Sequence, residues 1–557
     1  MNVRLALLCL LLSSLAPLAP LARAQDQDPP EVAIGERLFL ETRFAQFFAA
    51  HMSDVNQPLG NGGDPVVAEV ETTGDPLPGP FAGHAINCRQ CHFVDENLVL
   101  QPNGLPDLAT GGMRSYADFA RHSPVPDRGD GRTHTPRNSP ALVNASLPRK
   151  GGTQFHFDGE FATLRELVKE TLLGRNYGWL PGERKQAMAH VARVIRQDDG
   201  RGELANGTGG AYRLVFAGTD PRLPEAFVLP PLLRLDVSKA SDEAIVNQVA
   251  KLVARYVEQL EFARDADGSF DGSPYDRFLL RNHLPRQPRG RETPAQYSKR
   301  LAAALDALPT PLFVAEVDGP FRLHDQPFVF DAQELAGLKL FLRQPAQDPN
   351  DPNGPQGSVG NCVACHPAPF FTDFLFHDTG VSQREYDALH GAGAFAALEI
   401  PSRAERAEDP SSLPPTFKHP EASGRFRAAA EAGDPSKTDL GAWNVLGNPD
   451  FPHAQGRLRG ALVRSLGHNP GKDALLDAAL ARFKTPGLRD LGHSNPYMHD
   501  GAFDSLEDAV GFYIPASNAQ RAGTLRNGAP ELAGVRISGG DVAALAAFLR
   551  SLNEDYQ

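Results

Sequence analysis

The stretches CRQCH at residues 88–92 and CVACH at residues 362–366 decide how this chain is built. Both have the spacing Cys-x-x-Cys-His, which is the pattern that attaches a c-type haem. In such a site the two thiols bond covalently to the haem, and the adjacent imidazole binds the iron. Five cysteines occur in the 557 residues, and four of them lie in these two stretches. The sequence therefore predicts two covalently bound haems.

The residues of the two motifs have separate predicted roles. The attachment residues are Cys88, Cys91, Cys362 and Cys365, and the proximal iron ligands are His92 and His366. The alternative is a structural zinc site made from the two Cys-x-x-Cys pairs. Histidine accounts for only 17 of the 557 residues, so a histidine directly after both pairs is not expected by chance. This pattern favours haem over zinc.

The first 24 residues have the features of a secretory signal peptide. Arg4 supplies the positive n-region, an apolar run follows it, and Ala22-Arg23-Ala24 is a small-x-small cleavage site. The apolar run is too short to span a bilayer. Cys9 lies within that run rather than after it, which argues against a lipoprotein. Since c-type haem is attached outside the cytoplasm, signal and motifs agree, and we expect a protein of the periplasm.

The composition limits the kinds of partner. The formal net charge is −13, which argues against nucleic acid as a partner. An acidic surface could steer a basic electron-transfer protein, although ordinary solubility explains the charge equally well. After the first 24 residues no apolar stretch approaches the length of a membrane span. Monomer and homodimer both stay open.

The two motifs lie in two diverged copies of one sequence pattern. GERLFL at 35–40 precedes the first motif, and GLKLFL at 337–342 precedes the second. DGEFATLRELV at 158–168 follows the first motif, and DGAFDSLEDAV at 500–510 follows the second. In both of the later stretches a Thr or Ser stands three residues before an acid, as at the start of a capped helix. Each copy therefore predicts a helix, a haem-bearing segment, a loop and a capped helix.

The chain divides into four predicted segments. These are a signal peptide (1–24), an N-terminal haem c domain (25–175), a helical insert (176–330) and a C-terminal haem c domain (331–557). Apolar residues at helical spacing predict helices over 187–195 and 244–262, and another from about residue 541. Few stretches have the alternation of a strand. The predicted fold is mainly α, with two c-type cytochrome haem domains from a diverged duplication and a helical insert between them.

Several longer motifs carry a resemblance to a known family. In the first half they are RNSPALVN at 137–144 and FHFDG at 155–159; in the second they are FTD at 371–373, HDTG at 377–380, TPGLR at 485–489 and PYMHDG at 496–501. With these motifs the chain resembles the bacterial di-haem cytochrome c peroxidase superfamily, including its MauG-like branch. The resemblance covers both haem halves and is weak over 176–330.

The resemblance implies a division of labour around a bound calcium ion. The C-terminal haem would receive electrons from a small periplasmic donor such as a cytochrome c, and the N-terminal haem would react with hydrogen peroxide. Tyr513 stands where family members place a Met or Tyr distal ligand, and a packed tyrosine is the alternative. The calcium ligands of the family match Asn138, Ser494 and Pro496, an oxygen-rich set that suits a hard cation.

The distal side of the first haem is less well defined by the sequence. His122 and His134 lie in the loop where the family carries a removable distal histidine. Glu170 and Glu160 are the nearest carboxylates that could move a proton during cleavage of peroxide, although either could be a solvated charge. Phe157 stands where the family usually has a Trp between the haems. Because Phe is harder to oxidise than Trp, electron hopping through this residue is in doubt.

Three functions are compatible with these residues. The first is a di-haem peroxidase that reduces hydrogen peroxide to water. The second is a MauG-like or oxygenase-like enzyme that oxidises a protein or organic substrate; Tyr513 and the long insert favour it. The third is an electron carrier without peroxide chemistry. The sequence ranks them in this order, with the first two close.

Overall fold

The computed structural model describes residues 28–60, 62–70, 77–78, 83–92, 123–205, 207–321, 324, 326–346 and 356–555. The predicted signal peptide, Cys9 and His122 lie outside these residues. The described chain is mainly helical, with 43% helix and little strand, as predicted. Its strands form two short antiparallel pairs, β1 (Glu69–Val70) with β2 (Leu77–Pro78) and β3 (Phe376–His377) with β4 (Phe483–Lys484).

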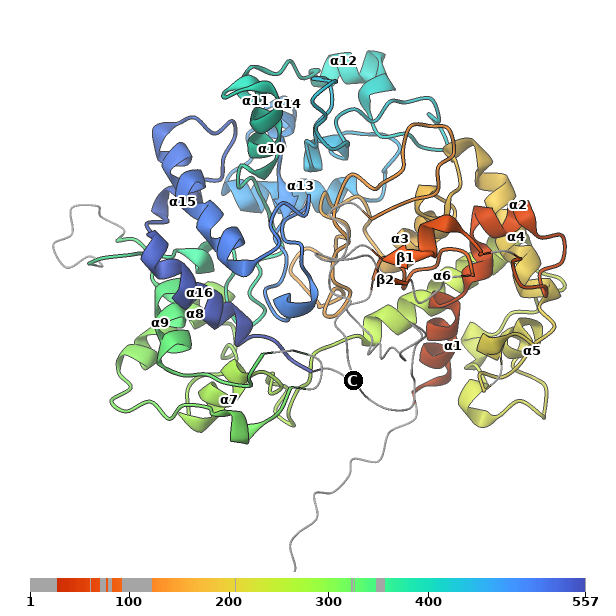
Figure 1. Cartoon of the computed structure of the whole chain (residues 1–557), viewed down its shortest axis with the longest axis horizontal. Coiled ribbons are helices and arrows are strands. Elements are labelled where there is room, and N and C mark those ends of the chain that lie inside the picture. Colours follow the sequence, from red (N-terminus) through yellow and green to blue (C-terminus); the bar gives the residue numbers. More distant parts are fainter. Residues whose placement is uncertain are drawn as a thin grey trace, which may run out of the picture.

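The helices are distributed along the whole chain (Figure 1). They are α1 (Pro30–Phe39), α2 (Gln46–His51), α3 (Leu164–Leu172), α4 (Arg184–Gln197), α5 (Tyr212–Ala217), α6 (Asp242–Gln259), α7 (Pro274–Arg281), α8 (Pro294–Asp306), α9 (Ala332–Leu342), α10 (Val381–His390), α11 (Ala394–Ala397), α12 (Arg403–Glu408), α13 (Gln455–Leu466), α14 (Lys472–Asp477), α15 (Leu506–Ala522) and α16 (Val542–Arg550). Two 3-10 helices bear on the site, η3 (Arg175–Tyr177) and η9 (Cys362–Ala364).

The first hydrophobic core joins α1, α3, α4, α5 and α6, the red to yellow part of Figure 1. It extends from Val32 to Val257 and includes the partly buried Cys88 and Cys91. Helix α1 crosses α6 closely at Gly35, where a Cβ would collide with the carbonyl of Leu252. This close approach explains the glycine of the first GERLFL stretch.

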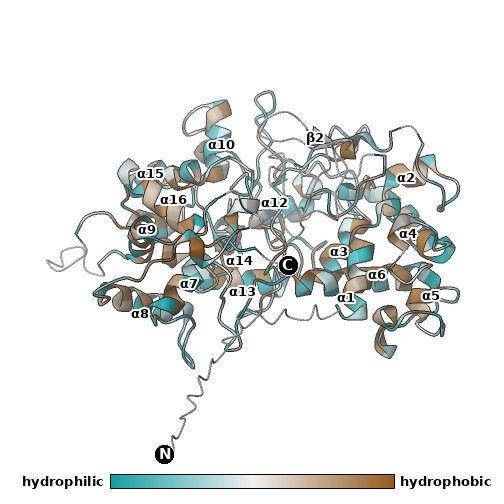
Figure 2. Ribbon diagram, turned by 60° about the horizontal axis from the view of Figure 1, so that its bottom comes forward, coloured by the Kyte–Doolittle hydropathy of each residue, from teal (hydrophilic) through white to brown (hydrophobic). Residues whose placement is uncertain are grey.

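The second core repeats this arrangement with α7, α8, α9, α15 and α16. Here α9 crosses α16 at Gly337, and a Cβ on this glycine would collide with the carbonyl of Ala544. Gly35 and Gly337 therefore have the same structural role. Each allows the helix before the motif to pack closely on the last helix of its unit. Figure 2 shows the apolar faces of these helices turned toward one another.

A third core, which the sequence did not suggest, lies between the second motif and α15. It comprises residues from Phe376 to Ala481 and is built mainly on α10, α13 and α14, at the top of Figure 1. Trp443 is its largest buried side chain, with Arg406 stacked 4.1 Å from the ring centroid. This third core reaches the first unit through Arg457, whose guanidinium donates to the carbonyls of Thr153 and Ala162.

The predicted helical insert, 176–330, is shared between the first two cores. Its helices α4, α5 and α6 belong to the first core, and α7 and α8 belong to the second. The first core therefore runs through the boundary predicted at 175/176. Helix α6 packs on α1 in the first unit as α16 packs on α9 in the second. The segment up to Gln259, the end of α6, therefore completes the first unit.

Local sequence signals placed the helices correctly. Helices occur over 184–197 and 242–259, as the apolar spacing predicts, and α16 begins at Val542. Thr163 caps α3 by accepting from the amide of Glu166, and Ser505 caps α15 by accepting from that of Asp508. The prediction of a capped helix after each Asp-Gly is confirmed.

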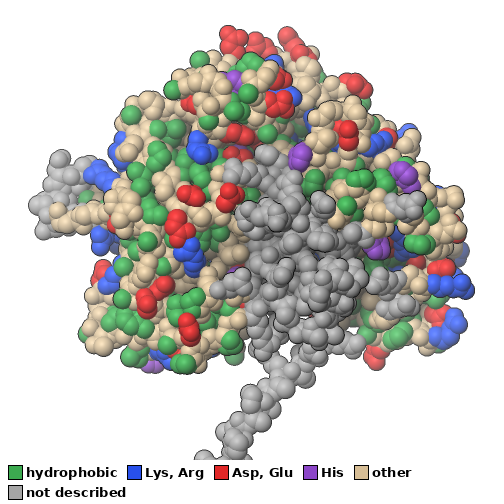
Figure 3. All heavy atoms as spheres, in the orientation of Figure 1, with side chains coloured by type: hydrophobic (Ala, Val, Ile, Leu, Met, Phe, Trp, Pro, Cys, Tyr) green, Lys and Arg blue, Asp and Glu red, His purple; other side chains and the backbone are tan. Residues whose placement is uncertain are grey.

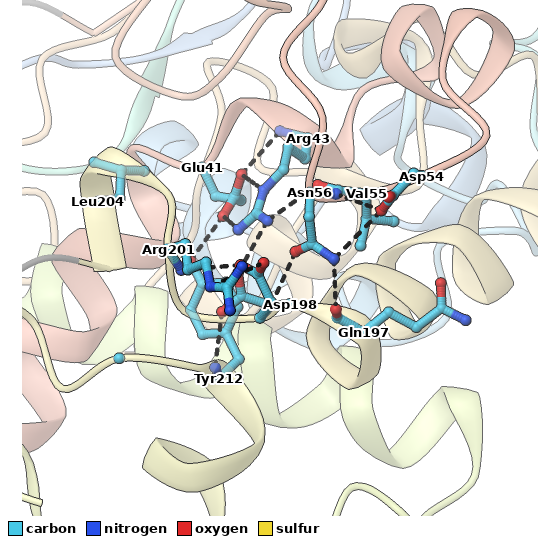
Figure 4. Close-up of polar contacts among 12 residues, drawn as sticks. Glu41, Arg43, Asp54, Val55, Asn56, Gln197, Asp198, Arg201, Leu204 and Tyr212 are labelled. Carbon is cyan, nitrogen blue, oxygen red and sulfur yellow. Dashed lines mark hydrogen bonds and ion pairs between the residues drawn. The ribbon is translucent and has the colours of Figure 1, made fainter.

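A buried network of charges lies inside the first unit (Figure 4). Asp198 binds both Arg37 and Arg43, and Glu41 binds Arg43 through both carboxylate oxygens. Tyr212 donates to Glu41 at 2.9 Å, and Arg37 lies 3.9 Å from the centroid of its ring. Each buried charge thus has an opposite charge beside it, as burial requires.

The surface is mixed in character. On the face drawn in Figure 3, basic side chains lie scattered among acidic and neutral ones. Among the described residues, no helix combines the length and apolarity that crossing a membrane requires.

Candidate haem sites

The first Cys-x-x-Cys-His motif holds its histidine in the orientation that iron binding needs. Nδ1 of His92 lies 3.1 Å from the carbonyl oxygen of Pro140. A carbonyl can only accept, so Nδ1 carries the proton and Nε2 keeps the lone pair. Burial lowers the pKa of His92 to about 4, against the opposing effect of the Pro140 carbonyl. The imidazole is therefore neutral at ordinary pH, and a hydrogen bond at Nδ1 is the usual support of a metal-binding histidine.

The second motif repeats this geometry. Nδ1 of His366 lies 2.8 Å from the carbonyl oxygen of Phe371, which again leaves Nε2 with its lone pair. Burial lowers the pKa of His366, while the carbonyls of Phe371 and Pro486 oppose the shift. Pro486 follows Thr485 as Pro140 follows Ser139, so the two motifs lie against equivalent Ser/Thr-Pro segments.

The thiols of both motifs fit covalent haem. All four described cysteines are free of disulfides. Burial raises the pKa of Cys91 to about 11 and that of Cys362 to about 12, so these thiols stay protonated at neutral pH. A zinc site built from both motifs would need the two pairs close to each other. Cys88 and Cys91 instead pack against the first core and Cys362 against the second, which fits two separate haems.

Each motif has a buried tyrosine beside it. The hydroxyl of Tyr177 lies 3.1 Å from Sγ of Cys88. Burial raises the pKa of Tyr513, and the neighbouring Cys365 and Cys362 raise it further. Tyr513 therefore lies near the second motif, where the resemblance places a distal ligand. Burial likewise raises the pKa of Tyr177 well above its usual value. Ligation by Tyr513 stays a prediction, and a ferric ion would have to supply the charge that stabilises its phenolate.

The sequence missed Tyr177 because it is not at the repeat position of Tyr513. That position is Thr171, in α3, whereas Tyr177 comes six residues later in η3. Only the path of the chain after α3 brings its hydroxyl to Cys88.

The Asp-Gly turns of the two halves have the same backbone shape. Phe155 pairs with Phe161 in one, and Tyr497 pairs with Phe503 in the other. The next residue is left-handed in both, with φ of 61° at His156 and 73° at Met498. Phe157 in the first turn is therefore the counterpart of His499 in the second.

The two turns are joined to the opposite half by a crossed pair of backbone hydrogen bonds. The amide of Asn138 donates to the carbonyl of His499 at 2.8 Å, and the amide of Lys484 donates to that of Phe157 at 2.6 Å. Asn138 stands two residues before Pro140, as Lys484 stands two residues before Pro486. Each proximal histidine thus lies against a short segment that is anchored on the other half.

The surroundings of the two turns differ in charge and in aromatic character. Arg137 pairs with Asp158 at 2.8 Å and with Asp439 at 2.5 Å, and Arg427 binds Asp158 and Glu160. Burial opposes ionisation of Asp158, but the coulombic effect of the two arginines outweighs it, so the pKa of this carboxyl is held well below its usual value.

The counterpart of Phe157 has a stacked aromatic partner. The ring of His499 stacks on Phe483, with centroids 3.5 Å apart and an interplanar angle of 15°. Nε2 of His499 lies 3.4 Å from the hydroxyl of Ser382. This aromatic contact lies within the second half, and the sequence predicted no role for either His499 or Phe483.

The residues matched to calcium are only partly brought together. The side-chain amide of Asn138 donates to the carbonyl of Pro496. The hydroxyl of Ser494 lies 3.4 Å from the carbonyl of Leu491. Asn138 and the Pro496 carbonyl could therefore turn toward a common cation, and the calcium site stays a prediction.

The two predicted catalytic side chains lie in ordinary surroundings. His134 is exposed, and its Nδ1 lies 2.9 Å from the hydroxyl of Thr133. Glu170 binds the guanidinium of Arg184 with both carboxylate oxygens. Glu160 also has partners, since it pairs with His156 at 2.9 Å and with Arg427. The catalytic roles of His134 and Glu170 stay predictions, and neither residue is poised as a free acid or base.

Comparison with curated proteins gives distant relatives of one kind. Over 194 residues the chain is 26% identical to the cytochrome-c peroxidase IdrP2 of Denitromonas iodatirespirans, across 35% of this chain and 36% of that protein. Over 93 residues it is 32% identical to the methylamine utilization protein MauG of Paracoccus denitrificans, across 14% of this chain and 24% of that protein. The matched part spans about a third of the first relative's length. No family model matches the chain.

Solved structures resemble the chain over nearly its whole length. The diheme peroxidase BthA of Burkholderia thailandensis superposes with a TM-score of 0.41 and 16% identity over 97% of this chain and 89% of that one. A MauG-like protein associated with microbial copper homeostasis gives 0.42 and 15% over 95% and 91%.

Two observations point to one family. The curated relatives include a cytochrome-c peroxidase and MauG. The chain carries two Cys-x-x-Cys-His motifs, and the histidine of each is hydrogen-bonded at Nδ1 to a backbone carbonyl. The chain is therefore similar, over parts of its length, to the di-haem cytochrome c peroxidase and MauG-like family of oxidoreductases.

Proposed function

We propose that this protein is a periplasmic di-haem peroxidase, which reduces hydrogen peroxide to water with electrons from a small redox protein such as a cytochrome c. One observation carries the proposal: each of the two motifs contains a buried histidine whose Nδ1 is hydrogen-bonded to a backbone carbonyl. This bond leaves Nε2 of each imidazole with a lone pair for the iron of a haem. The family relatives supply the reaction class.

The two haems would have different tasks. The second unit would receive electrons, because Tyr513 lies near its cysteines and could close the sixth position of its iron. The first unit would react with peroxide, as the family resemblance implies, and its buried Tyr177 lies at the sulfur of Cys88. The matched turns, glycines and crossed hydrogen bonds support an origin of the two units by duplication.

Bound haem would supply the one-electron redox chemistry of peroxide reduction. The chain itself holds each imidazole as the Nδ1–H tautomer, at His92 through Pro140 and at His366 through Phe371. Such hydrogen bonds raise the basicity of the ligand nitrogen and tune the metal. Asp158 contributes as a fixed negative charge between Arg137 and Arg427, which also fastens the first turn to the second half.

A calcium ion between the halves is part of the proposal. Asn138 and the carbonyl of Pro496 already lie in contact across the two halves, and Ser494 is nearby in sequence. Oxygen ligands completed by water suit calcium. Metal analysis of the purified protein tests this, and failure to find one equivalent of calcium, either as purified or after titration with calcium, would contradict it.

Steady-state peroxide turnover with reduced cytochrome or a dye donor tests the function. We expect turnover far above that of free haem, and its loss when either motif is removed by Cys-to-Ala substitution. A rate equal to free haem in protein with two bound haems would overturn the peroxidase. Mass analysis of the exported protein tests the location, because cleavage after Ala24 should leave Gln25 as the first residue.

A MauG-like oxidation of a protein or organic substrate is the second candidate, and the tyrosine near the second motif favours it. Oxidising equivalents that persist after one equivalent of peroxide, in the absence of donor, would support this candidate. Their immediate decay together with rapid donor turnover would support the peroxidase.

A further inference from the structure

The crossed hydrogen bonds link the proximal side of each haem site to the opposite half. In the first unit the imidazole of His92 is bonded to the carbonyl of Pro140, and Asn138, two residues earlier, donates to His499 of the second half. The support of His92 thus depends on a segment whose other end is fixed by the second Asp-Gly turn.

The second unit contains the mirror arrangement. Lys484 donates to the carbonyl of Phe157 at 2.6 Å, and the following Thr485 donates to Leu375 at 2.8 Å. The side chain of Thr372 in turn donates to the carbonyl of Thr485 at 2.8 Å. This segment is therefore held immediately before Pro486, whose carbonyl also acts on the His366 imidazole. Through Thr372 it is tied to the neighbouring Phe371, whose carbonyl accepts the Nδ1 hydrogen bond of His366.

Hydrogen bonds to a ligating imidazole set the electron density at the metal, and so they set its reduction potential. Each segment carries a carbonyl that faces the proximal imidazole and is also hydrogen-bonded to the opposite half. A displacement of the opposite half would therefore move this carbonyl relative to the imidazole. Phe157 is a poor electron relay, but its carbonyl rather than its ring makes the contact here.

We propose that Asn138 and Lys484 are positioning residues, whose backbone amides couple the proximal hydrogen bond of each haem to the Asp-Gly turn of the opposite half. The inference rests on the two bound haems of the proposed function and on no assumption about the substrate. It explains how the halves communicate where the expected bridging Trp is absent.

A pair of substitutions at one position isolates the amide. Lys484→Pro removes the donor N–H, and Lys484→Ala keeps it, while both remove the amine. Residue 484 is the last of strand β4, and the preceding residue is extended, as a residue before proline prefers. We expect Lys484→Pro to raise the potential of the second haem relative to Lys484→Ala, because the support of His366 loosens.

The readout is the reduction potential of each haem from an optical and EPR titration. A tenfold shift in the one-electron equilibrium corresponds to about 59 mV, and we expect a shift of this order at the second haem and a smaller one at the first. Each potential is assigned by repeating the titration in protein that lacks one pair of cysteines. Equal potentials in the Pro and Ala variants would overturn the proposal.

A second variant tests the hydrogen bond from Asn138 to His499. It also provides a test if Lys484→Pro does not fold. Gly501→Ala places a side chain at φ 65° in the second turn, which displaces the His499 carbonyl from Asn138. We expect the potential of the first haem to move more than that of the second, although the substitution lies in the second half. A shift confined to the second haem would overturn the proposal.

The outcome separates this inference from the proposed function. Protein with two haems and crossed shifts but no peroxide turnover would reject the peroxidase and keep the coupling. Protein with peroxide turnover but without crossed shifts in potential would reject the coupling and keep the peroxidase. A preparation of the exported protein without covalent haem would contradict both.

Discussion

The two haem units are built from the same parts but differ in the helix that follows the Asp-Gly turn. In the first unit α3 ends at Leu172, and the chain turns so that Tyr177 in η3 reaches Cys88. In the second unit α15 continues to Ala522, and Tyr513 within it lies near the second motif. The tyrosine beside the motif therefore comes from the segment after the helix in the first unit and from within the helix in the second.

The comparison also shows where the halves depend on each other. The first core holds its charges in the network of Asp198 with Arg37 and Arg43. The second holds Arg489 bound through both guanidinium nitrogens to Asp276. Between the units, Arg137 and Arg427 share Asp158. The two units thus share a backbone plan but differ in their buried charges.

Removing one pair of cysteines should have the largest effect. Cys88→Ala with Cys91→Ala, or Cys362→Ala with Cys365→Ala, should reduce covalent haem from two to one per chain, because each thiol pair attaches one haem. Pyridine haemochrome analysis measures this. Cys9→Ala, in the predicted signal peptide, is the control and should leave two. An unchanged haem count in either double variant would contradict the assignment of that motif.

Breaking one buried charge pair in each unit should destabilise the protein by about 3–5 kcal/mol. Asp276→Ala leaves Arg489 buried without its paired carboxylate, and Asp198→Ala leaves Arg37 so, while Arg43 keeps its pair with Glu41. Urea unfolding followed by circular dichroism measures the change. As a control, Glu258→Ala removes an exposed pair with Arg255 and should leave the midpoint unchanged. Similar midpoints for all three variants would contradict the prediction.

The stability of the second unit should fall as pH rises through neutrality. Burial raises the pKa of Glu554 from 4.5 to about 8, since its carboxyl lies among buried groups near Asp276. A raised carboxyl pKa means that the folded protein binds the extra proton, so stability is lost between about pH 4.5 and about pH 8. Glu554→Gln should flatten this dependence in thermal unfolding, whereas Glu507→Gln on the surface should not. A wild-type slope in Glu554→Gln would refute it.

The junction between the units should show the opposite sign. The pKa of Asp158 is held low, because Arg137 and Arg427 outweigh the effect of burial. Its contribution to stability is present above its ordinary pKa of 3.8 and is lost as pH falls further. We expect Asp158→Asn to be less stable at neutral pH and to lose less stability on acidification than the wild type. Parallel acid-unfolding curves would contradict this.

The smallest expected effects are spectroscopic and compare the two tyrosines. Tyr513→Phe should change the Soret band and the EPR signal of the second haem, because it removes an oxygen near that motif. Tyr177→Phe should perturb the first haem less, because its hydroxyl lies at the Cys88 sulfur, at the attachment edge of the haem. An unchanged spectrum in Tyr513→Phe would exclude ligation by this residue.

The fold could be predicted as far as local patterns reach. The helices over 184–197, 242–259 and 542–550 follow from apolar spacing, and the starts of α3 and α15 follow from Thr163 and Ser505. The third core could not be predicted, because its residues between 376 and 481 have no repeat in the first half. Its packing depends on pairs far apart in the chain.

The sequence by itself predicts the four cysteines for haem attachment, the two proximal histidines and the repeated pattern, because these are short motifs at fixed spacing. Only the tertiary structure decided that α6 completes the first unit, that Tyr177 reaches Cys88, and that Asn138 and Lys484 fasten each half to the other. These contacts join residues far apart in the chain. Burial and the need to satisfy every buried polar group select them, and neither leaves a local signature.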